Sequence, residues 1–158
     1  MRIAAAGAMA LAALVVGTVA SPASATPPTR AHAVPGVFVL EGVCDFPIVY
    51  DETVNKGVMT FFPDGHRAGT GSYKVRITNA NDPTKSMDIN ATGPQWFYPD
   101  GTDKLGGHTL FILFQGWDFT SGLYLGTGNW SIAFDDQGGI VSITGNGHIG
   151  PNLCSKIA

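Results

Sequence analysis

The stretch FVLEGVCDFPIVY, residues 38–50, decides the fold prediction. In an extended chain alternate side chains point to the same side, and every even position here except Gly42 is apolar. The odd positions mix valines with Glu41, Asp45 and Pro47. Proline cannot donate a hydrogen bond to a neighbouring strand, so Pro47 indicates a bend or a sheet edge. The stretch therefore predicts a strand with one core face.

The two cysteines predict a disulfide between this strand and the end of the chain. Cys44 lies on the predicted core face, and the other cysteine is Cys154. Residues 1–25 have the pattern of a secretory signal peptide, with Arg2, an Ala-rich apolar run and the small-residue cleavage site Ala23-Ser24-Ala25. An exported chain enters an oxidising compartment, where two cysteines pair by default. We therefore expect a secreted, extracellular protein with a Cys44–Cys154 disulfide.

Length and charge limit the possible partners. Residues 26–36 are rich in proline and poor in apolar side chains, which predicts a flexible tail. Residues 37–158 are long enough to bury a core, and we expect them to form a single all-β domain. Arg2 is one of 9 basic residues, so after cleavage 8 remain against 12 acidic residues, a formal charge of −4. The basic residues are scattered, so we expect no nucleic-acid partner and, after cleavage, no membrane.

The rest of the chain has the pattern of short strands separated by turns. Alternating apolar and polar residues predict strands at Tyr73–Ile77, Met87–Ala91 and Trp130–Phe134. Residues His108–Trp117 are apolar on both faces, which predicts a central strand covered on both sides. Further strands are expected at Met59–Phe61, Gln95–Tyr98, Leu123–Leu125 and Ile140–Ile149. We predict an all-β fold, a small antiparallel β-barrel built as an up-and-down meander, with a two-sheet β-sandwich as the alternative.

The sequence shows no motif for catalysis, for a cofactor or for a metal. The run Gly145–Gly150 matches G-x-G-x-x-G, but it leads into Pro151 and not into a helix, so it predicts a kinked strand. No histidine pair has zinc-finger spacing, and no G-x-S-x-G motif is present. We therefore assign no catalytic residue, no metal ligand and no cofactor, although ligands from distant strands can converge in a sheet protein.

Two aromatic clusters carry the ligand-binding prediction. Trp96-Phe97-Tyr98 and Trp117-Asp118-Phe119 stand at strand ends, where at least one ring of each cluster faces away from the core. Exposed Trp or Tyr rings at a barrel mouth suit a sugar or an apolar ligand, although plugging of the barrel end is the more common role of such rings. His66 and Arg67 follow a turn, where they are suited to a small acidic ligand, although a solvated turn is the more common explanation for polar residues at a loop tip. The candidate ligand-binding residues are Trp96, Tyr98, Trp117, Tyr124, His66 and Arg67.

The chain resembles a group of small secreted proteins of actinobacteria. The resemblance rests on the Ala-rich signal peptide, on Phe38–Pro47, on the Tyr73–Thr92 hairpin and on the ending from Thr144 to Cys154. It covers most of the chain after the leader. It implies the β fold and the disulfide, and it carries no activity over.

Two hypotheses for the function follow. The first is a non-enzymatic β domain that binds a small apolar ligand, a glycan or a cell-envelope partner through its aromatic-rich end. The alternative is a β-barrel enzyme of the cyclase or isomerase type that acts on an apolar small molecule, by analogy of fold alone. His108 or His148 next to an acid inside the barrel would mark the enzyme. We prefer the binding domain because the sequence shows no catalytic set.

Overall fold

The computed structural model describes residues 26–158, and the predicted signal peptide, residues 1–25, lies outside them. Sheet A contains β1 (Thr29–His32), β4 (Val58–Phe61), β5 (Arg67–Thr70), β8 (Gln95–Phe97), β9 (Thr102–Leu113), β10 (Gly122–Phe134), β11 (Ile140–Gly145) and β12 (His148–Asn152). Sheet B contains β2 (Val37–Leu40), β3 (Ile48–Asn55), β6 (Tyr73–Asn79) and β7 (Asp82–Asn90). All pairings are antiparallel, which confirms the all-β antiparallel prediction.

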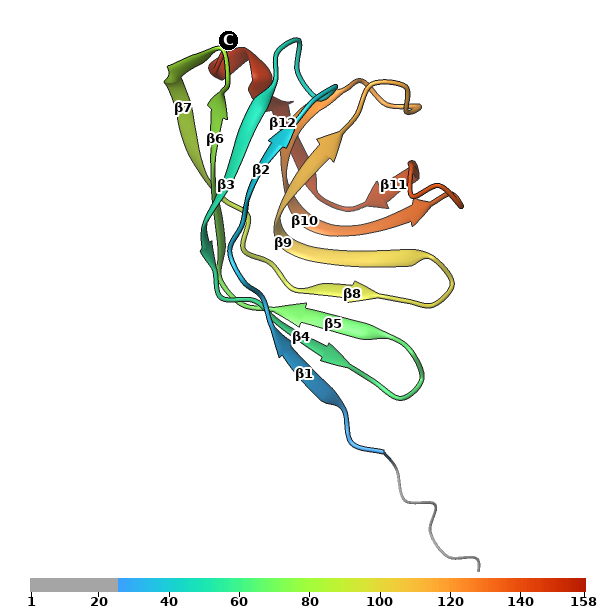
Figure 1. Ribbon diagram of the computed structural model, residues 1–158. Helices are drawn as coiled ribbons and strands as arrows, with labels where there is room; N and C mark the ends of the chain where they lie inside the picture. The colour runs from blue at the N-terminus through green and yellow to red at the C-terminus, as the bar shows by residue number, and fades with distance from the viewer. Residues whose placement is uncertain (1–25) are drawn as a thin grey trace, which may run out of the picture.

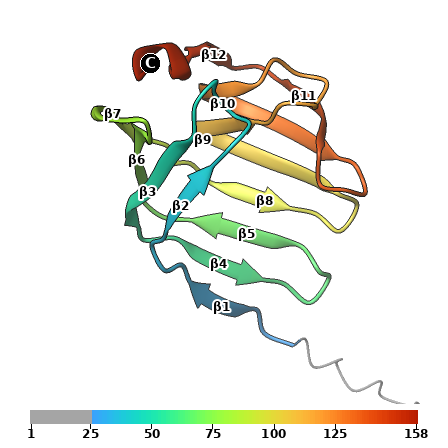
Figure 2. The same ribbon diagram turned by 45° about the horizontal axis from the view of Figure 1, so that its top comes forward.

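The chain is an up-and-down meander that is folded across two sheets. β1 leads into β2, β3 into β4, β5 into β6 and β7 into β8, so each of these pairs of strands passes from one sheet to the other through a short bend (Figure 1). We call each such pair of consecutive strands an arm, so that β1–β2, β3–β4, β5–β6 and β7–β8 are four arms. Each of the first three arms pairs with the next arm in both sheets. In Figure 2 the strands of sheet B run at a steep angle to those of sheet A from the line of bends.

Glycines allow the backbones to come close together at these bends. A side chain on Gly71, which has φ of +134°, would collide with the backbone of Lys56 and Gly57 in the neighbouring arm. A side chain on Gly93 would collide with the carbonyl oxygen of Gly106. Only a residue without Cβ fits such an approach, so the bends are fixed by these glycines.

The meander does not close into a barrel within residues 26–158. Sheet A has the order β1-β4-β5-β8-β9-β10-β11, with β12 also paired to β10, and sheet B has the order β2-β3-β6-β7. No strand pairing joins the first arm to the last in this part of the chain. The closed barrel is therefore not observed, and the two sheets agree with the sandwich alternative. The bends instead place sheet B over one end of β9 and β10, where the residues of both pack together.

Residues 38–50 form two strands and a loop, so the prediction of one continuous strand is wrong. β2 ends at Leu40 and β3 begins at Ile48. Between them Gly42 has φ of +72°, a left-handed conformation that favours glycine and allows the chain to reverse. The loop buries Val43, which is 1% exposed, whereas Phe38 is 52% exposed. Alternation with a period of two cannot reveal such a reversal.

The predicted disulfide between Cys44 and Cys154 is present, with the two Cα atoms 5.6 Å apart. Cys154 lies in the 3₁₀ helix η1 (Leu153–Lys156) that follows β12. Leu153 and Ile157 are buried on either side of it. The side-chain amide of Asn79, at the end of β6, donates a hydrogen bond to the carbonyl oxygen of Ile157 (3.0 Å). Covalent, apolar and polar contacts therefore all fix the C-terminal end against sheet B and its β2–β3 loop.

Two hydrophobic clusters lie on opposite faces of β9 and β10. The first cluster lies between these strands and sheet B, where Leu110 and Ile112 of β9 pack against buried residues such as Ile77. The second cluster contains Phe111 and Leu113 of β9 together with residues of β10 and β11. β9 is therefore covered on both faces, as the apolar run from His108 to Trp117 predicts.

Some strand boundaries differ from the prediction. β10 is unbroken from Gly122 to Phe134, where the sequence predicts two shorter strands, and the expected last strand divides into β11 and β12. The expected Pro-rich tail contributes β1, whose four residues are exposed and pair with β4. Between residues 26 and 158 no helix has the length and apolar character needed to cross a bilayer.

Candidate ligand-binding groove

Four side chains form a row across sheet A. Trp96 of β8 pairs with Lys104 of β9, Lys104 pairs with Ser131 of β10, and Ser131 pairs with Thr144 of β11. Directly paired residues of antiparallel strands point to the same face, with Cβ atoms roughly 5 Å apart. An indole ring, an ammonium group and two hydroxyl groups therefore stand side by side on one face of the sheet.

Sheet B covers the other end of this same face. β9 and β10 keep one register along their length, with Lys104 paired to Ser131 and Leu110 paired to Leu125. Lys104 and Leu110 are separated by an even number of residues, so both point to the same face. Leu110 and Leu125 pack into the first hydrophobic cluster beneath sheet B. The strand ends that carry the row extend away from sheet B (Figure 1), and the side chains of Trp96, Lys104 and Thr144 are exposed.

An open groove of about 560 Å³ follows the row, and we call it the Trp96 groove. Trp96 (37% exposed) and Tyr98 (36% exposed) form its aromatic side. Asn129 and Asn146 add two carboxamide groups beyond the hydroxyl groups of the row. Lys104 is the one charged residue in the lining, in a chain whose formal net charge is −3. Exposed rings beside hydrogen-bonding side chains suit a ligand that has both apolar and hydroxylated surfaces.

His66 stabilises the aromatic side of the groove. Its ring stacks on Phe62 with centroids 4.0 Å apart and on Tyr98 with centroids 6.3 Å apart. The ring nitrogen Nδ1 of His66 forms a hydrogen bond with the carboxylate of Asp64. Lys104 Nζ lies 5.2 Å from the centroid of the Tyr98 ring, within the range of a cation–π interaction. These contacts connect the β4–β5 turn to the β8–β9 turn at the rim.

Arg67 lies on the opposite face of sheet A from Trp96. It pairs with Phe97, which in turn pairs with Asp103. The guanidinium carbon of Arg67 lies 5.1 Å from the centroid of the Phe97 ring. Burial raises the pKa of Asp103, and the nearby charge of Arg67 acts in the opposite direction. Arg67 is therefore separate from the Trp96 groove.

Trp117 and Tyr124 also lie apart from the groove, because both pack against the second hydrophobic cluster. Trp117 contacts Phe114 edge to face, with ring centroids 5.3 Å apart. The hydroxyl group of Tyr124 donates a hydrogen bond to the carbonyl oxygen of Thr120 (3.2 Å), and its ring lines a separate hollow of about 260 Å³. The six predicted residues thus do not form one site. Trp96 and Tyr98 line the groove, His66 supports its rim, and Arg67, Trp117 and Tyr124 lie elsewhere.

Sequence reasoning did not single out the polar side of the groove. Lys104, Ser131 and Thr144 meet Trp96 only through the register of four strands, which no local pattern specifies. One signal was present for Ser131. It stands between Trp130 and Ile132, two core residues, so alternation places its side chain on the face opposite to the second cluster.

Two histidines lie further along the face that carries the groove. His108 of β9 and His148 of β12 both pair with Thr127 of β10, one on each side of it. Both histidines are exposed rather than enclosed. Over residues 26–158, no three His, Cys, Asp or Glu side chains lie close enough together to hold a metal ion.

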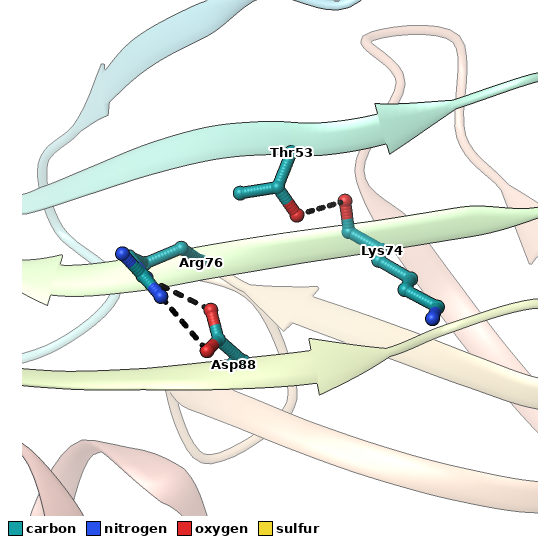
Figure 3. A network of polar contacts seen from close by, with 4 residues as sticks. All are labelled: Thr53, Lys74, Arg76 and Asp88. Atoms are coloured by element: carbon teal, nitrogen blue, oxygen red, sulfur yellow. Dashed lines mark hydrogen bonds and ion pairs between the residues drawn. The ribbon is translucent and has the colours of Figure 1, made fainter.

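The outer face of sheet B carries a polar network that has a structural explanation. Arg76 donates two hydrogen bonds to the carboxylate of Asp88, at 2.8 and 2.9 Å, and Thr53 donates one to the carbonyl oxygen of Lys74 at 3.2 Å (Figure 3). Arg76 and Asp88 are paired cross-strand residues of β6 and β7. The hydrogen bonds from Arg76 hold the pKa of Asp88 below its usual value. The network therefore supports the strand register on the solvent side of sheet B.

The lining of the Trp96 groove consists of aromatic, hydroxyl, carboxamide, apolar and glycine residues and one lysine. Its lining contains no thiol, carboxylate or imidazole group, so neither the Ser131 hydroxyl nor the Lys104 amine has a base beside it in the groove. No protein-family model, curated protein sequence or solved structure matches this chain, so a function has to be inferred from the groove itself.

Proposed function

We propose that the protein is a secreted, non-enzymatic β domain that binds a glycan in the Trp96 groove. The observation that carries the proposal is the row formed by Trp96, Lys104, Ser131 and Thr144, which is left open by sheet B. The disulfide is consistent with a role outside the cell, because such bonds persist in oxidising compartments.

The chemistry of a sugar ring complements this row. One side of a pyranose is formed by C–H groups, which stack on an exposed indole or phenol ring, and its edge carries hydroxyl groups. The carboxamides of Asn129 and Asn146 and the hydroxyl of Ser131 both donate and accept hydrogen bonds, as sugar hydroxyls also do. Because the groove is open rather than enclosed, it favours a chain that lies along the surface over a small molecule that must be surrounded.

A retention experiment with matched variants tests the proposal. Residues 26–158 with the disulfide formed would be mixed with insoluble peptidoglycan, chitin, cellulose and xylan, and the bound fraction measured. Trp96→Ala should weaken binding to the retained polymer about tenfold or more, because a tryptophan at the centre of an interface contributes about 2 kcal/mol.

Phe61→Ala is the matched control for this experiment. Phe61 is 39% exposed, close to the exposure of Trp96, but it lies on β4 outside the groove. It should leave retention unchanged. Absence of retention on all four polymers, or equal losses in the two variants, would contradict glycan binding by the groove.

The alternative proposal, a cyclase- or isomerase-type enzyme, needs an acid–base pair around an enclosed apolar substrate. His108 and His148 were its candidate residues, and their exposure gives it little support. The groove lining likewise offers no carboxylate or imidazole. The binding domain is therefore the function that we propose.

A further inference from the structure

A second cavity, of about 450 Å³, lies where the arms bend from one sheet into the other. It is separate from the Trp96 groove, because the two share no lining residue. Its apolar wall includes Met59, Ala91 and Leu110, and its polar wall includes Tyr50 and Tyr73. The volume lies within the range of roughly 300–1,000 Å³ that is usual for small-molecule sites.

The polar wall is an ordered chain of hydrogen bonds. The hydroxyl of Tyr73 donates its only proton to Glu52 Oε1 (2.8 Å), so in the contact between the two tyrosine hydroxyls (2.7 Å) Tyr50 must be the donor. Glu52 Oε2 accepts hydrogen bonds from Asn55 Nδ2 (3.1 Å) and from the backbone N–H of Gly36 (3.0 Å). Both tyrosine protons are thus committed inside the protein. The oxygen atom of Tyr50 keeps free lone pairs, so the wall offers an acceptor to a ligand.

Burial and charge keep the two tyrosine hydroxyls protonated. Burial raises the pKa of Tyr50, and for Tyr73 burial, the hydrogen bond with Tyr50 and the neighbouring Glu52 all raise the pKa. Both phenols therefore remain neutral, and the direction of the hydrogen bonds stays fixed over the physiological range.

We infer that this cavity is a second binding site, for a small, largely apolar ring compound that carries one hydroxyl group. The ring fills the space beside Met59, Ala91 and Leu110, and the hydroxyl donates to the tyrosine oxygen. Gln95, which also lines the cavity, supplies a carboxamide that donates to the ligand oxygen. The site does not depend on the glycan proposal, because it uses none of the groove residues.

Gly69 provides a way to close the cavity. It pairs with Met59 on one side and Gln95 on the other, and all three residues line the cavity. A Cβ atom on Gly69 would lie 3.3 Å from Met59 Cε and 3.8 Å from Gln95 Cβ, so the flexible end of Met59 accommodates it. Gly69→Val therefore adds bulk to the cavity at a strand position that favours β-branched residues. Ala68→Val, one residue away and outside the cavity lining, is the matched control.

The test uses naphthol as the probe and methylnaphthalene, which lacks the hydroxyl, as its near-isosteric partner. Titration of residues 26–158, followed by fluorescence and by amide chemical shifts, should show naphthol binding about fivefold more tightly than methylnaphthalene, as one neutral hydrogen bond predicts. The shifts in the unaltered protein should centre on Gly69, Gln95 and Leu110. Gly69→Val should weaken naphthol binding at least tenfold, and Ala68→Val should leave it unchanged.

The inference is overturned if neither probe binds, if the two probes bind equally, or if Gly69→Val binds naphthol as the unaltered protein does. It is also overturned if the shifts centre on Trp96 and Lys104, because the probe would then occupy the groove. The shift map is recorded on the unaltered protein, so the location of binding is decided even if a variant folds poorly.

Discussion

Removal of the disulfide should cost the protein about 4–5 kcal/mol of stability. The bridge between Cys44 and Cys154 joins residues that are 110 apart in sequence. For a loop of this length the chain-entropy model gives a loss of about 16 cal/mol/K in the unfolded chain, or about 4.8 kcal/mol at 25 °C. Domains of this size have a free energy of unfolding of about 5–15 kcal/mol, so the bridge supplies a third or more of the total.

The folded state should survive this change. Leu153 and Ile157 remain buried on either side of position 154, and the hydrogen bond from Asn79 to Ile157 does not involve sulfur. The C-terminal segment therefore stays against sheet B in a Cys44→Ala/Cys154→Ala variant. The loss arises mainly because the unfolded chain gains freedom, and not because contacts disappear from the folded chain.

Urea unfolding followed by tryptophan fluorescence measures the loss. With a slope of about 2 kcal/mol per molar urea, the midpoint should fall by about 2 M in the double-alanine variant. Reduction of the unaltered protein with a thiol should lower the midpoint by the same amount. A fall below about 0.5 M, which corresponds to about 1 kcal/mol, would refute the reasoning. So would a variant whose slope differs strongly, because its folded state would have changed.

Two further changes test the interior. Gly126→Ala should destabilise the protein by about 1–3 kcal/mol, because the added Cβ would lie 2.5 Å from the ring of Phe111. Thermal melting measures this loss, with Thr127→Ala, a change at an exposed neighbour, as the control. Equal melting temperatures of the two variants would contradict the prediction. Stability should decline as pH rises above about 10, because burial raises the pKa of Tyr50 and Tyr73 in the folded state and only the unfolded chain then releases those protons. Below pH 10 the stabilisation by the two protonated tyrosines is fully present. Above pH 10 the urea midpoint of Tyr73→Phe should fall less steeply with pH than that of the unaltered protein. Equal dependence of the midpoint on pH in the two proteins would argue against a role of Tyr73.

Features that depend on local chemistry were predictable from the sequence. With two cysteines in the chain, only one disulfide is possible within it, and Cys44–Cys154 is present. The apolar residues on both faces of β9 predicted that both faces are covered, because apolar side chains on a face of a strand indicate that this face is buried. The kink expected in the Gly145–Gly150 run also occurs, since β11 ends at Gly145 and β12 begins at His148.

Features that depend on distant strands were not predictable. Glycine is typical of turns, yet Gly126 and Gly128 both lie inside β10. At Gly126 the missing side chain leaves space for the ring of Phe111. The aromatic clusters at Trp96 and Trp117 look alike in sequence, but strand register places Trp96 on the open face, whereas Trp117 lies in the loop between β9 and β10 and packs against the second hydrophobic cluster. Lys104 joins Trp96 only because β8 and β9 pair in one register and not in the next, and a shift by one residue would move it to the other face.

The absence of closure and the presence of two candidate sites have a common cause. A closed barrel of these arms would cover one face of β9 and β10 along their whole length. Because Gly71 and Gly93 let the arms bend sharply, sheet B covers only the end near Leu110 and leaves the end near Lys104 to solvent. The cavity beside Tyr50 lies at the same bends, because Gly71 and Gly93 are among the residues that line it. A substitution that straightened the bends would therefore remove both sites together, whereas Trp96→Ala and Gly69→Val should each affect one site alone.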